Sequence, residues 1–414
     1  MSHDILVLGA GMIGTCTALQ LQRRGHRVTL LDRRAPGLET SYGNAGIIQR
    51  EAVQPYAFPH EPQLLWQAAT GRSLAIRYHL GALPGLLPRL ARYWLASGAG
   101  RYPTIASAYG RLIAHCQSEH ETLMREAGVV EGVRRQGYLS VFRSPQGLEQ
   151  AAREAEALAR EQGLGLDVLS AAGLAQAEPG LRPGLAGALH WRDPWTVQDP
   201  GALVQAYARH FEALGGQLWQ GDAGGLSRRS GGGWQIQTDQ GLWQGPHAVV
   251  ALGPWTPRLL EPLGLRLPLF VKRGYHRHYR GGPGLTLPVL DSEQGFVLAP
   301  MAQGVRLTTG AELARRDAAP TPVQLYRAEP VARGLIDLPE AVETQPWMGC
   351  RPCTVDMLPL IGPAPGQPGL WVHAGHGHQG FTLGPASARL LADQIDGTPP
   401  LIDPTPYLPS RFRP

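Results

Sequence analysis

The residues with the clearest chemical use are three glycines, Gly9, Gly11 and Gly14, followed at a distance by the carboxylate of Asp32. Four apolar residues precede the glycines, as in a buried strand that turns directly into a helix. In such a unit the first glycine permits the turn, the second admits a pyrophosphate and the third lets helix and strand pack closely. An acidic residue after the second strand accepts both ribose hydroxyl hydrogens of an adenosine. The spacing predicts a site for an adenosine dinucleotide.

The same unit leaves the identity of the dinucleotide open between FAD and NAD. Met12 and Ile13 begin the predicted helix, whose free N–H groups and positive dipole end bind a pyrophosphate. Arg33 and Arg34 follow Asp32 and suit a 2′-phosphate, but the carboxylate of Asp32 would repel one. We therefore do not predict an NADP site.

The composition restricts the classes of protein to which the chain can belong. The 414 residues carry a formal charge of +5, and Lys272 is the only lysine among the 38 basic residues. These residues are spread along the chain, so we predict no nucleic-acid partner. Four scattered cysteines do not form a disulfide framework. With no signal peptide and no membrane span in the sequence, we expect a cytoplasmic protein.

The elements that must position these residues come from separated parts of the chain. The C-terminal region follows the same order of strand, glycine-rich turn and helix as the N-terminal unit. The strand is expected at 370–374, the turn at 375–380 and the helix at 383–395. Residues 109–127 and 147–162 show helical periodicity, and residues 267–343 alternate as strands do. We predict an α/β fold with a Rossmann-like dinucleotide domain formed by residues 1–48, 197–266 and 346–398. Residues 49–196 and 267–345 then form an α+β substrate domain on an antiparallel sheet, and residues 399–414 a proline-rich C-terminal tail.

Five motifs occur in an order that resembles a known family. They are the unit at residues 5–32 and the segments 40–46, 249–256, 351–362 and 375–380. Together they resemble the FAD-dependent D-amino-acid oxidase superfamily, and within it the D-amino acid dehydrogenase branch; they are also similar to glycine and sarcosine oxidases. The likeness extends from end to end, although the middle blocks match loosely. It implies that the cofactor is FAD.

Two of these segments have side chains suited to a flavin. Ser41 and Asn44 can donate to flavin oxygens, and the glycines of segment 40–46 allow a planar ring to approach the backbone; the alternative is a plain surface turn. The turn at 375–380 would stabilise negative charge on the flavin, although His376 and His378 can instead be ordinary loop histidines. We predict no metal site. The predicted cofactor contacts are Gly9, Gly11, Met12, Ile13, Gly14, Asp32, Arg33, Thr40, Ser41, Asn44, Ala45, Gly46, Ile47, Ala251, Gly253, Trp255, Gly375, His376, Gly377, His378, Gln379, Gly380, Phe381 and Thr382.

Arg351 is the predicted substrate anchor. The resemblance implies that this arginine, followed by Pro352, binds an amino-acid carboxylate, and a guanidinium presents the planar fork for two charge-assisted hydrogen bonds. Tyr275 is predicted to make a second carboxylate contact, with a core tyrosine as the alternative. Tyr56 and Arg50 complete the predicted substrate site.

Several other features have two interpretations each. Lys272 is a surface lysine in the favoured interpretation and an oxygen-activating or flavin-contacting residue in the other. The resemblance to sarcosine oxidases implies, as one interpretation, that the flavin is covalently attached through a thioether bond to Cys350; in the other the flavin is bound non-covalently. Tyr138, Trp191 and Trp195 either line a substrate pocket or pack in the core. Residues 64–96 form either a helical cap or a contact with the inner-membrane surface.

The function predicted from the resemblance is FAD-dependent oxidative deamination of a D-amino acid or a cyclic D-imino acid of the D-proline or hydroxy-D-proline type. Hydride would pass from Cα to flavin N5, and electrons then to a quinone-linked acceptor or to oxygen. The alternatives are a sarcosine- or glycine-type N-methyl amino acid oxidase and a non-catalytic FAD-binding subunit. Oligomeric state, chirality and ring size are left open.

Overall fold

A six-stranded sheet carries the glycine motif in the computed structural model, which describes residues 2–71, 73–281 and 284–412. The strand order is β10-β2-β1-β14-β22-β21. All neighbours run parallel except β21, which is antiparallel to β22. The strands are β1 Asp4–Leu8, β2 Arg27–Asp32, β10 Gln217–Gln220, β14 His247–Val250, β21 Leu360–Pro363 and β22 Leu370–Ala374. This is the predicted Rossmann-like arrangement.

The two faces of this sheet are covered differently because side chains alternate along each strand. Ile5 and Val7 of β1 are buried among residues of the helices α1 (Met12–Arg23), α8 (Pro200–Ala213) and α11 (Gly380–Asp396). Leu6 and Leu8 are buried on the opposite face beside a three-stranded sheet. That sheet consists of β11 Ser227–Arg228, β12 Trp234–Thr238 and β13 Gly241–Gly245.

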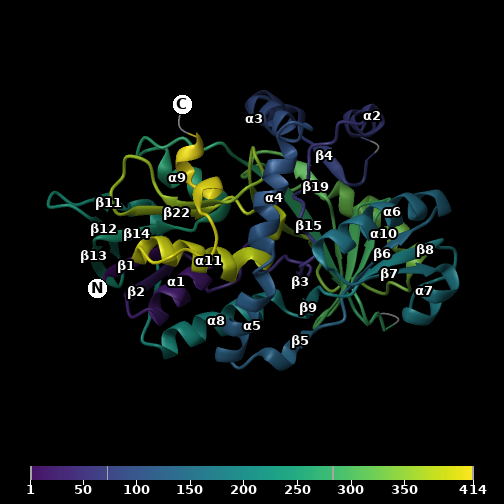
Figure 1. The fold of residues 1–414 in the computed structure, drawn as a ribbon, viewed down its shortest axis with the longest axis horizontal. Helices are drawn as coiled ribbons and strands as arrows, with labels where there is room; N and C mark the ends of the chain where they lie inside the picture. The colour runs from purple at the N-terminus through teal and green to yellow at the C-terminus, as the bar shows by residue number, and fades with distance from the viewer. Residues whose placement is uncertain (1, 72, 282–283, 413–414) are drawn as a thin grey trace.

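The two ends of the chain meet in this layer, as the sequence predicts. Helix α1 follows β1 near the N-terminus, and α11 follows β22 near the C-terminus; the two helices pack against each other (Figure 1). Asp199 caps the N-terminus of α8, because its carboxylate accepts from the N–H of Ala202 at 2.9 Å. No helix in the described ranges combines the length and hydrophobicity needed to cross a bilayer.

A larger mixed sheet forms the other half of the molecule (Figure 1). Its order is β4-β19-β15-β18-β17-β16-β6-β8-β7, and β20 also pairs with β15. Most neighbours are antiparallel; β16–β6 and β19–β4 are parallel. The strands are β4 Ile76–Tyr78, β6 Tyr138–Phe142, β7 Leu166–Ser170, β8 Gly187–Trp191, β15 Leu269–Tyr279, β16 Val289–Asp291, β17 Phe296–Met301, β18 Gly304–Thr308, β19 Ala311–Leu313 and β20 Trp347–Thr354.

The pairing of β20 moves one predicted boundary. Leu269 to His276 of β15 align residue by residue with Thr354 to Trp347 of β20. Because β20 is a strand of the large sheet, we propose that the third segment of the dinucleotide domain begins after residue 354 and not at 346. The other boundaries are kept as proposals.

The remaining helices cover the large sheet, link the two halves or, at residues 256–260, pack on the dinucleotide side. They are α2 Pro62–Ala69, α3 Leu83–Ala96, α4 Tyr102–Ile113, α5 Cys116–Glu126, α6 Pro145–Gln162, α7 Ala171–Ala177, α9 Thr256–Leu260 and α10 Val323–Leu335. A small sheet of β3 Ile47–Ile48, β9 Trp195–Val197 and β5 Val133–Arg134 lies between the halves. Short 3-10 turns occupy Leu80–Ala82, Val130–Gly132, Ala223–Gly225, Gly253–Trp255, Gly377–Gln379, Thr405–Tyr407 and Pro409–Phe412.

One sequence prediction differs from these elements. The single helix expected over 109–127 is broken between Ile113 and Cys116, and its periodicity crosses the break because α4 and α5 both pack on α11. The C-terminal tail packs on the body as far as it is described, with residues 413–414 outside the described part. Tyr407 is buried and its hydroxyl donates to the carbonyl of Ala108 at 2.6 Å.

Candidate active site

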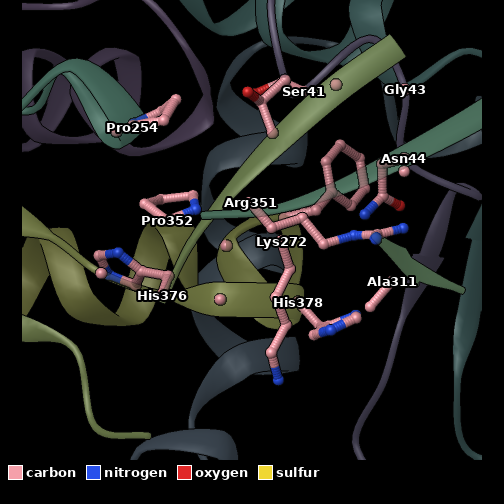
Figure 2. Close-up of a pocket in the computed structure, with 18 of the residues that line it drawn as sticks. Ser41, Gly43, Asn44, Pro254, Lys272, Ala311, Arg351, Pro352, His376 and His378 are labelled. Carbon is pink, nitrogen blue, oxygen red and sulfur yellow. The ribbon is translucent and has the colours of Figure 1, made fainter. Parts of the chain in front are cut away.

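An elongated cavity of about 790 Å³ runs between the two large sheets. Gly9, Asp32 and Trp255 line one end, and Arg351 and Tyr138 line the other. Figure 2 shows Arg351, Lys272 and His378 extending into the same space from different elements. Among the described lining residues, the carboxylates of Asp32, Glu39 and Asp222 all lie toward the first end.

The glycine turn at the first end is built for close approach. Gly9 has φ +105°, and a Cβ there would lie 2.5 Å from the carbonyl oxygen of Ala251. A Cβ on Gly14 would lie 1.7 Å from the oxygen of Gly9, so Gly14 is the helix-packing glycine and does not line the cavity. Asp32 accepts from the N–H of Ala10 at 2.6 Å, which fixes its carboxylate beside the turn.

Arg33 and Trp255 form one wall of this end. The guanidinium of Arg33 lies 4.4 Å from the centroid of the Trp255 ring and forms an ion pair with Glu39 at 2.7 Å. Both residues line the cavity, as do Ala251 and Gly253. The predicted contacts from segment 249–256 therefore surround the same space as the glycine turn.

The segment 40–46 is tied to α1 and to β20. The Ser41 hydroxyl accepts from the N–H of Met12 at 2.9 Å, and its own proton remains free to donate. Thr40 donates to the carbonyl of Cys350 at 3.0 Å. The Asn44 side-chain oxygen accepts from the N–H of Gly46 at 2.8 Å, which leaves its amide N–H groups available (Figure 2).

The turn at 375–380 forms the opposite wall. Helix α11 begins at Gly380, and Gly375, Gly377, Gly380 and Phe381 line the cavity. His376 is buried and its Nε2 lies 3.1 Å from the hydroxyl of Ser387. Burial lowers the pKa of His376 to about 3, so the ring is neutral near pH 7 and adds no positive charge.

His378 faces the substrate end. Its ring lies 4.9 Å from that of Tyr56, and both line the cavity. Burial, together with the nearby charges of Arg351 and Lys272, lowers the pKa of His378 well below its usual value. A neutral imidazole therefore stands beside two cations.

Arg351 projects from β20 over the backbone of Gly274. Its guanidinium donates to the carbonyls of Gly310 at 2.9 Å and Thr309 at 3.4 Å. A Cβ on Gly274 would lie 2.6 Å from it, so the missing side chain makes room for the planar group. Burial lowers the pKa of Arg351 below its usual value, and no described Asp or Glu forms an ion pair with it. The rest of the fork is available to an anion.

Lys272 faces the cavity and is not a surface lysine, so the interpretation favoured from the sequence was wrong. It pairs in register with Arg351 across β15 and β20. Its ammonium donates to the Tyr93 hydroxyl at 3.0 Å and lies 4.4 Å from the centre of that ring. The substrate end therefore holds two cations from adjacent strands.

Tyr275 and Arg50 do not have the predicted geometry. The Tyr275 hydroxyl donates to Glu312 at 2.7 Å and accepts from Arg273 and from the N–H of Thr321, so it has no proton left for a carboxylate. Tyr275 itself lines the cavity, but the hydrogen bonds of its hydroxyl group are made to residues on the large-sheet side. Arg50 does not line the cavity.

Further predicted residues lie behind the cavity wall. A Cβ on Gly46 would lie 2.1 Å from the carbonyl oxygen of Val197, so this glycine serves packing. Gln379 and Thr382 are buried and bond to each other at 2.7 Å. None of the three lines the cavity. Trp191 is buried in a core cluster and Trp195 packs on another, whereas Tyr138 lines the cavity.

Cys350 points away from the cavity. Gly349, Arg351 and Pro352 line it, but neither Cys350 nor Cys353 does. Burial also raises the pKa of the Cys350 thiol, which disfavours the thiolate. This geometry argues against a thioether at Cys350.

In the described part of the chain, one cluster brings together side chains of the types that bind metal ions. It consists of His276, His278 and Glu343. His278 bonds to Glu343 through Nδ1 and accepts from Arg306 through Nε2 at 2.9 Å. Both nitrogens are therefore used, and a guanidinium stands beside them. Arg306 in turn donates to the carbonyls of Tyr42 and Asn44 at 2.8 and 2.5 Å. The group supports the segment 40–46.

Sequence reasoning missed the residues that form the far wall and its polar edge. The wall is apolar and comes from α2, β4, α3 and β19, at Leu65, Ala68, Ile76, Leu83, Leu90 and Leu313. Gln49 lines the polar edge and hydrogen-bonds to the buried Glu51. Glu51 is the single acidic residue between positions 40 and 60, which was the available signal.

A parallel sheet with a glycine turn at one end of a long cavity, and a mixed sheet with a guanidinium at the other, define a dinucleotide-dependent enzyme. Comparison with known proteins is more specific. Residues 4–394 match the family model described as FAD dependent oxidoreductase, so the chain belongs to this family. FAD is its cofactor, and the protein is an oxidoreductase.

Curated relatives agree with this membership, and a solved structure has a similar fold. The chain is 35% identical to a D-amino acid dehydrogenase of Cereibacter sphaeroides, over 96% of this chain and 93% of the relative. It is 32% identical to a D-amino-acid oxidase of Bradyrhizobium diazoefficiens, over 99% of each. The fold is similar to that of glycine oxidase from Geobacillus kaustophilus, with a TM-score of 0.74, 24% identity and full coverage of both chains.

The geometry of the cavity fits FAD. The N–H groups at the start of α1 open onto the glycine turn, Asp32 ends β2, and the start of α11 faces the same space. We propose that the lining residues among the predicted contacts hold the cofactor directly. Gly14, Gly46, Gln379 and Thr382 then support them from behind.

Proposed function

We propose that the protein is an FAD-dependent D-amino acid dehydrogenase or oxidase that deaminates a D-amino acid or a cyclic D-imino acid. The observation that carries the proposal is Arg351, a guanidinium on the cavity wall with no acidic partner among the described residues. A substrate carboxylate supplies that partner through the planar fork. The names of the curated relatives support the D configuration.

The chain's own residues supply binding and orientation. Arg351 binds the carboxylate, and the ammonium of Lys272 on the adjacent strand adds positive charge. Tyr56, Tyr138 and His378 enclose the other side. Bound FAD supplies the acceptor for the two electrons of the oxidation. Catalysis then depends mainly on positioning in a site shielded from water.

The apolar wall favours a substrate with an apolar side chain. Leu65, Ile76, Leu83 and Leu90 line the end beyond Arg351 and present no carboxylate to an amino-acid side chain. A basic side chain would have no partner there and would meet Arg351 and Lys272. We therefore place apolar D-amino acids and cyclic imino acids ahead of basic ones.

The second candidate is a glycine- or sarcosine-type N-methyl amino acid oxidase. The similarity in fold to glycine oxidase favours it. The length of the apolar wall disfavours it, because neither glycine nor sarcosine has a side chain to fill that space.

We further propose contact with a membrane surface, which suits a quinone-linked acceptor; oxygen is the alternative acceptor. Trp66, Leu80, Leu87, Trp94 and Leu95 make up five of the twelve exposed large hydrophobic residues in the described part. Arg89 and Arg92 stand on the same segment, as in helices that bind anionic lipids. Leu87→Glu combined with Trp94→Glu should abolish cosedimentation with anionic vesicles, whereas Leu242→Glu, exposed on β13, should not.

Anaerobic reduction of the flavin tests the proposed reaction. The absorbance of bound flavin should bleach with D-leucine, D-phenylalanine or D-proline. It should not bleach with their L-enantiomers, and sarcosine should act weakly. Bleaching by sarcosine and glycine alone would favour the second candidate, and bleaching by none of them would reject the proposal.

A further inference from the structure

Glu51 is a buried carboxylate beside the substrate end of the cavity and has no cationic partner in the described structure. Its residue is 6% exposed, and its Oε2 atom has no hydrogen-bond partner. Its Oε1 accepts from the side-chain amide of Gln49 at 2.8 Å. An isolated buried carboxylate is costly to ionise, so it takes up a proton readily.

A chain of amides fixes which oxygen is free. The side-chain oxygen of Gln49 accepts from Gln379 at 2.7 Å, and that of Gln379 accepts from Thr382 at 2.7 Å. Gln49 must therefore present its N–H to Glu51. Because Oε1 is held as an acceptor, a proton on Glu51 resides on Oε2.

Tyr138 connects this carboxylate to the cavity. It lines the cavity from β6 and packs in one cluster with Ile47, four residues before Glu51 in the chain. No hydrogen bond joins the Tyr138 hydroxyl to Oε2 of Glu51 in this arrangement. Tyr56, which is electrostatically coupled to both Glu51 and Arg351, lies in the same wall. The carboxylate anchor and the buried acid therefore serve one substrate space.

We propose that Tyr138 and Glu51 form a proton-accepting pair for the substrate amine. The inference rests on the proposed function, in which an ammonium must lose a proton before the C–H bond breaks. The Tyr138 hydroxyl first turns to donate to the free Oε2 of Glu51. The ammonium N–H bond then breaks and its proton passes to the Tyr138 oxygen, while the phenolic proton passes to Oε2 of Glu51. The products are a neutral amine, an unchanged tyrosine and a protonated carboxyl group. Tyr138 contacts the substrate, and Glu51 acts through it.

The groups around Glu51 set its titration. Burial raises its pKa to about 7, and the charge of Asp193 acts in the same direction. The side chains of Gln49 and Tyr138 lower it in part. The Tyr56 hydroxyl and the Cys116 thiol also interact electrostatically with the Glu51 carboxylate, and the Arg50 guanidinium interacts with the Cys116 thiol. The pair is thus an acceptor at neutral pH and loses that capacity in acid.

The test is the pH profile of anaerobic flavin reduction in the holoenzyme. In the wild type the rate should rise through an ionisation near 7. In Glu51→Gln it should fall by about 10²- to 10⁴-fold at pH 7. The rate should then recover above the pKa of the substrate ammonium, because solvent removes the proton there. Tyr138→Phe should show the same recovery.

Two matched variants and one spectroscopic signal separate this role from a structural one. Glu119→Gln changes an equally buried carboxylate outside the cavity, and Tyr279→Phe a buried tyrosine outside it; both should keep the wild-type profile. A protonated-carboxyl infrared band that titrates near 7 should be absent from Glu51→Gln. If Glu51→Gln lost the same factor in reduction rate at all pH values, or kept the wild-type pH profile, the proton-accepting pair would be overturned and the proposed function would stand. If no amino acid reduces the wild type, the proposed function falls and the pair falls with it.

Discussion

Replacing Arg351 should separate recognition of the substrate carboxylate from everything else that the protein does. The guanidinium has five N–H donors. Carbonyls of Gly310 and Thr309 take two of them, at 2.9 and 3.4 Å. Arg351→Ala should leave the substrate carboxylate unpaired in the cavity, at a cost of about 2–5 kcal/mol in kcat/KM. That cost corresponds to about a 30- to 5,000-fold loss.

The assay compares a D-amino acid with the amine that lacks its carboxylate. Arg351→Lys keeps the charge but loses the fork, so it should fall between wild type and Arg351→Ala. FAD content should stay near normal in both variants, and Arg209→Ala, exposed on α8, should match the wild type. Equal losses on the amino acid and the amine would mean that Arg351 supports the cofactor or the fold. The reasoning about the carboxylate would then be refuted.

Three further outcomes are expected. Asp32→Ala should weaken FAD retention, measured by flavin fluorescence after dialysis, and unchanged retention would remove this residue from the site. Glu51→Gln should abolish a pH dependence of stability. Because the folded pKa is raised from 4.5 to about 7, the free energy of unfolding should fall by about 3 kcal/mol as pH rises across that window. Denaturant unfolding at pH 5 and pH 8 measures this change in the free energy of unfolding. An equal change in the wild type and in Glu51→Gln would contradict the argument that burial raises the pKa of Glu51. Acid precipitation should release free FAD from wild type and Cys350→Ser alike, since Cys350 faces away from the cavity.

Much of the dinucleotide half could be predicted because its signals are local. The glycines, the following helix and Asp32 lie within one short unit, and their steric roles follow from the turn itself. The substrate half depends on pairing between distant strands. Nothing near Tyr275 in the sequence indicates that its hydroxyl donates to Glu312. Likewise, nothing near Lys272 indicates that it pairs with Arg351 of β20 and faces the cavity. Those contacts are set by strand register, which single-sequence periodicity does not contain.

The meeting of α1 and α11 also has a consequence for synthesis of the chain. The strand β22 and the helix that follows it are added to the cofactor side only after more than 350 residues have been made. Until then β14 has no partner on its β22 side, and α1 lacks the helix that covers it. The inserted large sheet has most of its strands available earlier, so on the ribosome it can form before the first motif of the sequence is complete. We therefore expect the cofactor to bind late, and a chain truncated before Leu370 should expose the apolar surface of its earliest helix.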